Sequence, residues 1–269
     1  MLVARQNSIL EIAQQVGRVT VDDLATRFDV SPQTIRKDLN ELCDQRLLAR
    51  VHGGAILSSG VENFGYDARR AIAIDEKEAI GRMAAALIPN NAALFINIGT
   101  TTEAVARALL RHTGLMVITN NINVANAMRP NRDIEVIIAG GVVRRSDGGI
   151  VGEAAVDFIK QFRVDYAIIG VSAIDEDGAL LDYDYREVKV AQAIITNARH
   201  VVLVADATKF ERAAPVRIGH LSQMHSFVTD RCENGAIRQI CTAAGVALHE
   251  TLGARTVSDA RETVSLAFD

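Results

Sequence analysis

The alternation of apolar runs with segments of helical spacing between residues 92 and 205 constrains the fold most strongly. The continuous apolar runs are residues 92–98, 115–119, 134–139, 166–170 and 201–205. Between or after them stand amphipathic segments at 76–87, 103–110, 124–128, 154–162 and 186–197. Uninterrupted apolar strands separated by helices are typical of a parallel sheet covered on both faces. The pattern therefore predicts a mostly parallel α/β domain, extended by a strand at 226–229 and a helix at 236–243.

The first 57 residues show a different pattern, in which three short helices are followed by a hairpin. Thr20 precedes the second helix and Ser31-Pro32 opens the third, and both are favoured residue types at helix starts. The third helix has an apolar stripe of Ile35, Leu39 and Leu42. The Gly53-Gly54 pair fits a tight turn or a close backbone approach. These features predict a helix-turn-helix unit.

The polar face of the third helix carries Gln33, Arg36, Lys37 and Asn40 at spacings of three and four. Arg and Lys reach phosphates or guanine edges, and Gln and Asn pair with adenine. A recognition helix reads bases mainly through its first residues. The alternative is that this polar face is only a solvated helix surface. For His52 in the hairpin, an exposed structural role is as consistent with the sequence as a DNA contact. The predicted DNA contacts are Ser31, Gln33, Thr34, Arg36, Lys37, Asn40, Arg50 and His52.

A Gly99-Thr100-Thr101-Thr102 loop joins the first predicted strand to its helix. Free amides at a helix N-terminus together with hydroxyl groups bind anions, and glycine admits the ligand close to the backbone. The loop lacks the Gly-Lys-Thr of a Walker loop and is not G-x-G-x-x-G. An ordinary helix-capping loop is the alternative.

Polar residues and glycines also follow the other predicted strands, and ligands of open α/β sheets bind beyond the carboxyl ends of strands. Lys209 supplies a cation that can pair with a phosphate. The segment 144–152 either closes over a ligand or is a turn with solvated charges. The predicted effector contacts are Gly99, Thr100, Thr101, Thr102, Asn120, Asn121, Gly141, Gly170, Ser172, Glu187 and Lys209.

The stretches Val30–Leu39 and His52–Ala55 resemble the DNA-binding signature of DeoR-type repressors. The resemblance extends to about residue 230 through stretches such as Phe95–Thr101, Thr119–Asn126 and Gly148–Ala154. It implies a winged helix-turn-helix near residues 3–58 and a sugar-phosphate sensor whose fold is related to ribose-5-phosphate isomerase. These stretches look closest to the branch of the family that responds to glycerol 3-phosphate. Other branches sense other phosphorylated sugars. We therefore expect a repressor that leaves its operator when a phosphorylated metabolite, here glycerol 3-phosphate, binds.

An active sugar-phosphate isomerase is the rival class, because Asp175, Glu187, Lys189 and Lys209 resemble a set of catalytic groups. Such isomerases carry a D-G-A-D-E run after the fourth strand. The matching residues here, Ile169–Ile174, contain no acid. We therefore expect no catalytic residue, no metal and no cofactor. A DNA-binding protein without any ligand is a third possibility, against which the predicted phosphate loop argues.

The expected domains are 1–57 for DNA binding, 58–75 as a linker, 76–252 as the sensor and 253–269 as a polar tail. The net charge of −4 allows a local basic patch for DNA. Cys43, Cys232 and Cys241 form no framework, which favours free thiols in a reducing compartment. The sequence shows no signal peptide and no run long enough to cross a membrane. We therefore expect a cytoplasmic homo-oligomer, dimeric or tetrameric, whose partner is double-stranded operator DNA.

Overall fold

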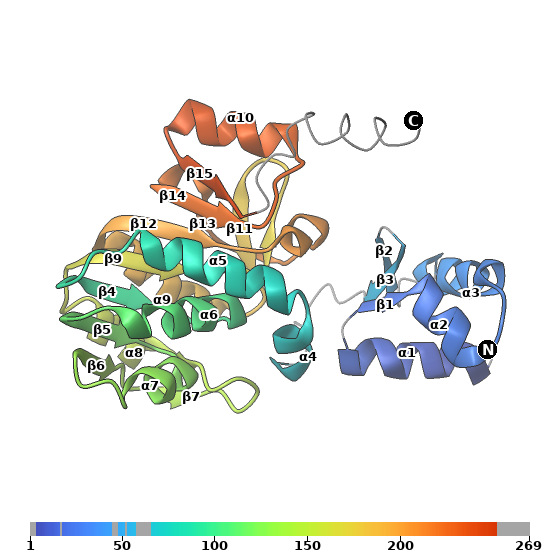
Figure 1. The fold of residues 1–269 in the computed structure, drawn as a ribbon, viewed down its shortest axis with the longest axis horizontal. Coiled ribbons are helices and arrows are strands. Elements are labelled where there is room, and N and C mark those ends of the chain that lie inside the picture. Colours follow the sequence, from blue (N-terminus) through green and yellow to red (C-terminus); the bar gives the residue numbers. More distant parts are fainter. Residues whose placement is uncertain (1–3, 17, 45–47, 52, 58–65, 252–269) are drawn as a thin grey trace, which may run out of the picture.

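The computed structural model describes residues 4–16, 18–44, 48–51, 53–57 and 66–251. A small N-terminal unit and a larger α/β unit lie at opposite ends of the molecule (Figure 1). The predicted tail and His52 lie outside the described residues.

A seven-stranded sheet forms the centre of the larger unit, with strand order β15-β14-β12-β9-β4-β5-β6. Every pairing between neighbours in this sheet is parallel, which confirms the predicted sheet type. Its strands are β4 (Ala93–Ile96), β5 (Leu115–Thr119), β6 (Ile134–Ile138), β9 (Val164–Ile169), β12 (Ala198–Val204), β14 (Ser226–Thr229) and β15 (Ala247–Glu250).

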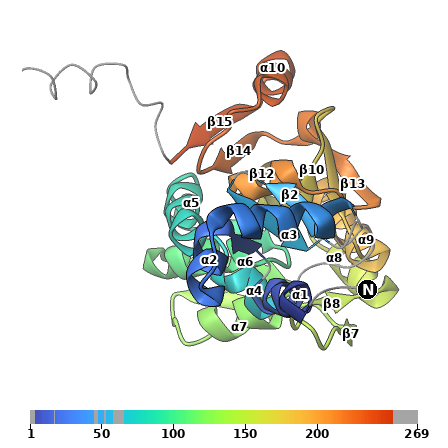
Figure 2. The ribbon, with the colours of Figure 1, turned by 90° about the vertical axis from the view of Figure 1, so that its right-hand side faces the viewer.

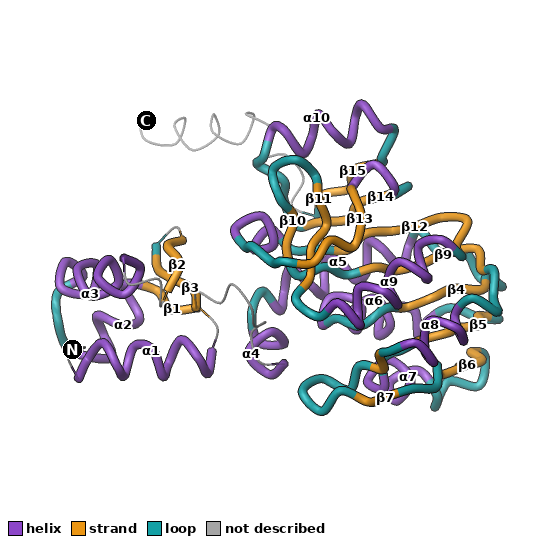
Figure 3. Tube along the Cα trace, turned by 180° about the vertical axis from the view of Figure 1, so that it is seen from behind, coloured by secondary structure: helices purple, strands orange, loops and turns teal. Residues whose placement is uncertain are grey.

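Helices cover both faces of this sheet and produce two separate cores. Successive residues of a strand point to opposite faces. Leu94 and Ile96 accordingly belong to one core, whereas Phe95 belongs to the other. The first core is closed by α5 (Ile74–Ala86), α6 (Thr100–Ala108) and α7 (Ile122–Met128). The second is closed by α8 (Glu153–Ile159), α9 (Tyr185–Thr196) and α10 (Gly235–Ala244). The helices and strands can be followed from behind in Figure 3.

Several short elements are additions to the predicted pattern. A small antiparallel sheet consists of β10 (Ala173–Ile174), β11 (Ala179–Asp182) and β13 (Val216–His220), in that order. A second pair joins β7 (Val142–Val143) to β8 (Ile150–Val151). Three 3-10 turns lie at Leu109–Arg111, Ala207–Glu211 and Leu221–Gln223. The strands β7, β8 and β10 have two residues each, which is too short for a periodic pattern to show in the sequence.

The N-terminal unit contains α1 (Ala4–Val16), α2 (Val21–Phe28) and α3 (Pro32–Asp44), followed by a wing. The wing is an antiparallel sheet of β1 (Arg18–Thr20), β3 (Gly54–Leu57) and β2 (Leu48–Val51), in that order. Figure 2 views the molecule from this end. Thr20 caps α2 by accepting from the Asp23 amide at 3.1 Å, as predicted. Ile35, Leu39 and Leu42 are fully buried, which confirms the predicted stripe.

Gly54 allows β3 to approach β1 closely within the wing. A Cβ atom at this position would lie 2.0 Å from the Val19 carbonyl oxygen. Such a contact with backbone cannot be relieved by a side-chain rotation. The second glycine of the predicted pair therefore serves a close approach of two strands.

A short helix, α4 (Tyr66–Ala71), lies within the segment predicted to be a linker. It precedes α5 directly and contacts the sensor through hydrogen bonds that are described below. Figure 1 shows it on the side of the sensor that faces the N-terminal unit.

Candidate effector pocket and nucleic-acid interface

The principal candidate site is a pocket at the point where the sheet order reverses. The chain continues from β4 to β5 and β6 on one side, and β9 occupies the other side of β4. The loops that follow two such strands separate, which leaves a crevice at their carboxyl ends. Residues Ile98–Thr101 after β4 and Gly170–Ser172 after β9 line this pocket.

One wall of the pocket is the N-terminus of α6. Gly99 is its N-cap residue, with φ of 148°, and no side chain caps the helix. That backbone conformation favours glycine. The first-turn amides of a helix carry partial positive charge and favour anions. The hydroxyls of Thr100 and Thr101 add further hydrogen-bonding groups on the same wall.

Lys209 reaches the pocket from the turn after β12. Its side chain is buried, with 8% of the residue exposed, and within the part of the chain that the structure describes Nζ donates no hydrogen bond and forms no salt bridge. Burial lowers its pKa and the neighbouring Arg212 lowers it further, whereas the nearby Asp206 carboxylate raises it. A buried cation without a hydrogen-bond acceptor is unfavourable. An anion in the pocket would remove that penalty.

The opposite wall carries two buried carboxyl groups. The Ser172 hydroxyl donates to Asp182 Oδ2 at 3.0 Å, and Asp182 and Glu187 are only 5% and 7% exposed. Burial raises the pKa of Asp182. Burial and the nearby Asp182 raise the pKa of Glu187 to about 8. Protonated or ionised, these groups can hydrogen-bond hydroxyls.

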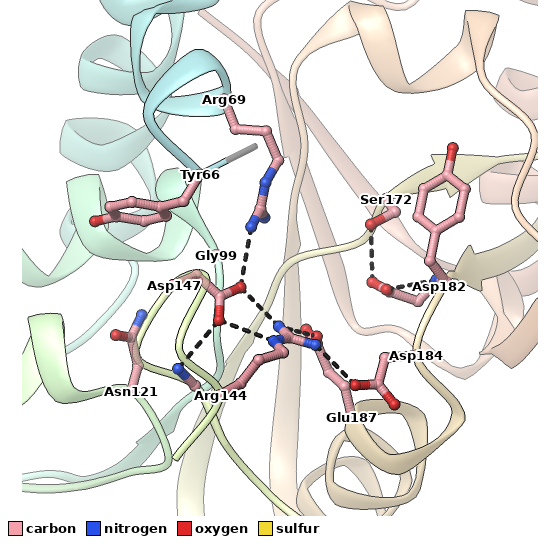
Figure 4. Close-up of polar contacts among 12 residues, drawn as sticks. Tyr66, Arg69, Gly99, Asn121, Arg144, Asp147, Ser172, Asp182, Asp184 and Glu187 are labelled. Atoms are coloured by element: carbon pink, nitrogen blue, oxygen red, sulfur yellow. Dashed lines mark hydrogen bonds and ion pairs between the residues drawn. The ribbon is translucent and has the colours of Figure 1, made fainter. Parts of the chain in front are cut away.

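Arg144 ties this wall to the loop between β7 and β8. Its guanidinium donates to Asp147 at 2.7 and 2.9 Å, to Asp184 at 3.1 Å and to Glu187 at 2.5 Å (Figure 4). The Asp147 carboxylate is 2% exposed. The reading of this segment as a turn with solvated charges is therefore wrong for these two residues.

Arg69 of α4 completes the lining of the pocket. Its Nη2 lies 3.0 Å from Asp147 Oδ2, and its side chain is 13% exposed. Figure 4 shows the side chain pointing from α4 toward this loop. Arg69 thus adds a second cation to the pocket, from a segment that sequence reasoning treated as a linker.

The structure brings together seven of the eleven predicted effector contacts: Gly99, Thr100, Thr101, Gly170, Ser172, Glu187 and Lys209. The other four do not line the pocket. Thr102 donates to the carbonyls of Asn97 and Gly99. Asn120 donates to the Ile150 carbonyl, and Asn121 caps α7 and donates to Glu103. Gly141 lies close to Ile150 and Val151 of β8. These four have internal structural partners.

Sequence reasoning missed Arg69 and Asp182 as lining residues. Asp182 ends β11, a strand that no pattern predicted. Arg69 stands beside a second arginine in a charged segment, and nothing in the sequence distinguishes the two. Their positions depend on how distant segments pack.

The predicted DNA-binding face is presented to solvent. Gln33, Arg36, Lys37 and Asn40 are exposed on α3. Ser31 accepts from the Thr34 amide at 3.2 Å, and the two hydroxyls lie 2.9 Å apart. In the wing, Arg50 Nη1 donates to Asn40 Oδ1 at 2.8 Å, which links β2 to α3.

The described residues contain no cluster of three or more potential metal ligands. In the same part of the chain, no helix has the length and apolar character needed to cross a membrane.

Comparison with known families identifies both units. Residues 5–60 match the DeoR-like helix-turn-helix domain, and residues 72–231 match the DeoR C-terminal sensor domain. The chain belongs to the DeoR family. It is therefore a DNA-binding transcription regulator with a sugar-phosphate-sensing domain, and not an enzyme.

Individual relatives of this DeoR-family chain are similar over most of its length. The glycerol-3-phosphate regulon repressor of Escherichia coli is 50% identical over 238 residues, which cover 88% of this chain and 94% of the relative. That of Haemophilus influenzae is 48% identical over 236 residues, 88% of this chain and 92% of the relative. Among solved structures, ribose 5-phosphate isomerase A of Methanocaldococcus jannaschii aligns with a TM-score of 0.39 and 15% identity, covering 51% of this chain and 54% of that one.

Proposed function

We propose that this repressor senses glycerol 3-phosphate in the pocket between β4 and β9, and that the bound effector releases the protein from its operator. The observation that carries the proposal is Lys209, a buried lysine for which the described residues supply no hydrogen-bond acceptor and which lines the pocket together with the uncapped N-terminus of α6. Two independent sources of positive charge thus converge on one small space, which is the environment that a phosphate group requires.

The two walls of the pocket match the two ends of a polyol phosphate. The α6 N-terminus, Thr100, Thr101 and Lys209 would hold the phosphate, while Asp182 and Glu187 would accept or donate hydrogen bonds to hydroxyls. Relatives named for the glycerol-3-phosphate regulon are 50% and 48% identical to this chain, which favours this effector over other phosphorylated sugars.

The exposed face of α3 would enter the major groove. Gln33, Thr34 and Arg36 lie at the start of the helix and would read bases, whereas Ser31 and Lys37 would contact phosphates. Asn40 and the wing residue Arg50 are hydrogen-bonded to each other, so they would contact the DNA backbone together. His52 is proposed as a flanking contact from the sequence alone.

A homo-oligomer is part of the proposal, since helix-turn-helix repressors read two half-sites related by two-fold symmetry. The edge strand β6 and the adjoining β7 expose apolar side chains: Ile138 is 44%, Val142 66% and Val143 47% exposed. Contiguous exposed apolar residues beside an open strand edge are typical of subunit interfaces.

The proposal is tested by titrating an operator complex with glycerol 3-phosphate, another sugar phosphate, glycerol and inorganic phosphate. Glycerol 3-phosphate should release DNA at the lowest concentration, and glycerol should have no effect. A double variant, Thr100→Ala with Lys209→Ala, should bind the operator normally and remain bound. If the double variant is released at the same effector concentration as the unmodified protein, the pocket is not the effector site.

A further inference from the structure

The helix that joins the two units, α4, supplies a side chain to the effector pocket. Of the residues that line the pocket, Arg69 comes from α4, whereas the others belong to α6, α9, β11 and the segments that follow β4, β9 and β12. Its guanidinium pairs with Asp147, whose carboxylate already receives two hydrogen bonds from Arg144. Asp147 therefore keeps a cationic partner when Arg69 leaves it.

The main chain of α4 is bound by residues of the same pocket and its surroundings. The Arg69 carbonyl accepts hydrogen bonds from the Lys77 ammonium and, at 3.5 Å, from the Thr100 hydroxyl. Lys77 Nζ also donates to the Ile72 carbonyl at 2.6 Å. Thr100 begins α6, so one hydroxyl of the proposed phosphate site also touches the end of α4.

The other end of α4 is held by the Tyr66 hydroxyl. The Tyr66 hydroxyl donates to Glu103 Oε2 at 2.8 Å and accepts from Asn123 Nδ2 at 3.0 Å. The helix is thus fixed at both ends to the sensor, with the pocket beneath its C-terminal end. A change in the pocket alters one attachment and leaves the Tyr66 attachment as a pivot.

The pocket as it stands is too small for a phosphate ester. Its free space is about 20 Å³, which is roughly enough for one or two water molecules. An effector must therefore displace a lining side chain. Arg69 is suited to this, because a guanidinium binds a phosphate through two parallel hydrogen bonds. These bonds are stronger than its present contact with Asp147, a carboxylate that Arg144 already neutralises.

We propose that Arg69 is a ligand of the effector phosphate, and that its transfer from Asp147 to the effector moves α4 and so transmits occupancy of the pocket to the DNA-binding unit. This inference rests on the proposed function, since it assigns a further residue to the same site. The effector would thus contact α4 directly. In the same step, the Thr100 hydroxyl would exchange its contact with the Arg69 carbonyl for one with the effector phosphate.

The test measures glycerol 3-phosphate binding by isothermal titration calorimetry, and operator release by gel shift, for the full-length protein. Arg69→Gln should weaken effector binding about tenfold to a hundredfold, as expected for loss of a charge-assisted hydrogen bond. Arg70→Gln is the matched control, because Arg70 is the exposed neighbour on the same helix, and its effector affinity should be unchanged. Arg69→Lys should fall between the two.

A second variant separates ligand binding from mere attachment of α4. Asp147→Asn weakens the same ion pair from its other side but keeps an oxygen that accepts from the Gly149 amide. Effector affinity should stay equal or increase, whereas Arg69→Gln decreases it. Equal losses in both variants, or an Arg69→Gln affinity matching that of Arg70→Gln, would overturn the inference. If the unmodified protein binds no phosphorylated compound, the proposed function itself fails, which is a different result.

Discussion

Replacing Lys209 by methionine should separate stability from effector binding, because the lysine is unfavourable in the free protein and needed in the complex. The ammonium is buried and no hydrogen-bond acceptor for it is recorded among the described residues. Replacing a buried charge that has no hydrogen-bond acceptor by an apolar side chain of similar length removes the cost of burying that charge. Asp206 keeps Lys77 and Arg212 as neighbouring cations in the variant. The free variant should therefore melt at the same temperature as the unmodified protein or higher.

The effect on binding follows from the lost phosphate contact. A hydrogen bond to a charged group contributes about 1.5–3 kcal/mol, so the dissociation constant should rise by up to about a hundredfold. At a ligand concentration of a hundred times Kd, an effector stabilises the unmodified protein by about 2.7 kcal/mol, and the variant by only about 0.4 kcal/mol. For a unit of this size these energies correspond to melting shifts of roughly 5–11 °C and 1–2 °C.

Differential scanning calorimetry with and without glycerol 3-phosphate measures both quantities. Lys160→Met is the control, because Lys160 is a solvent-exposed lysine at the end of α8. A Lys209→Met protein that melts several degrees lower yet keeps the full effector shift would refute the reasoning, since the lysine would then be a structural residue.

Three further predictions concern the other parts of the molecule. Arg36→Ala should weaken specific operator binding, measured by gel shift, by about 1–3 kcal/mol, and should leave effector binding, measured by calorimetry, unchanged. The control Arg82→Ala replaces an exposed residue of the sensor and should alter neither. Effector Kd should rise as pH increases through about 8, the raised pKa of Glu187, because its ionisation adds negative charge to the pocket that binds the anionic effector. A Kd that is constant from pH 7 to 9 contradicts this, and Glu187→Gln should flatten the rise. Gly54→Ala places a Cβ 2.0 Å from the Val19 carbonyl oxygen, so it should destabilise the wing by about 1–3 kcal/mol, visible as faster hydrogen exchange in β1 and weaker operator binding.

Sequence reasoning determined the local structure of this chain well wherever the physical signal is itself local. The cap at Thr20, the start of α3 at Pro32 and the buried stripe on α3 follow from spacings of three and four residues and from preferences at helix ends. The apolar runs likewise predicted the strands of the parallel sheet, and Leu115–Thr119 and Ser226–Thr229 match in full.

The composition of the pocket was decided by tertiary structure. The adjacency of β4 and β9, which brings Gly99 and Gly170 to one crevice, is a long-range pairing that no local pattern encodes. Asp182 reaches it through a short antiparallel strand, and Arg69 through a helix docked by a buried lysine and a tyrosine. Periodicity reports which face of an element is buried, but the partner that buries it is selected by packing of the whole chain. The sequence therefore determined which strand ends carry polar groups, and only the fold decided which of those groups meet.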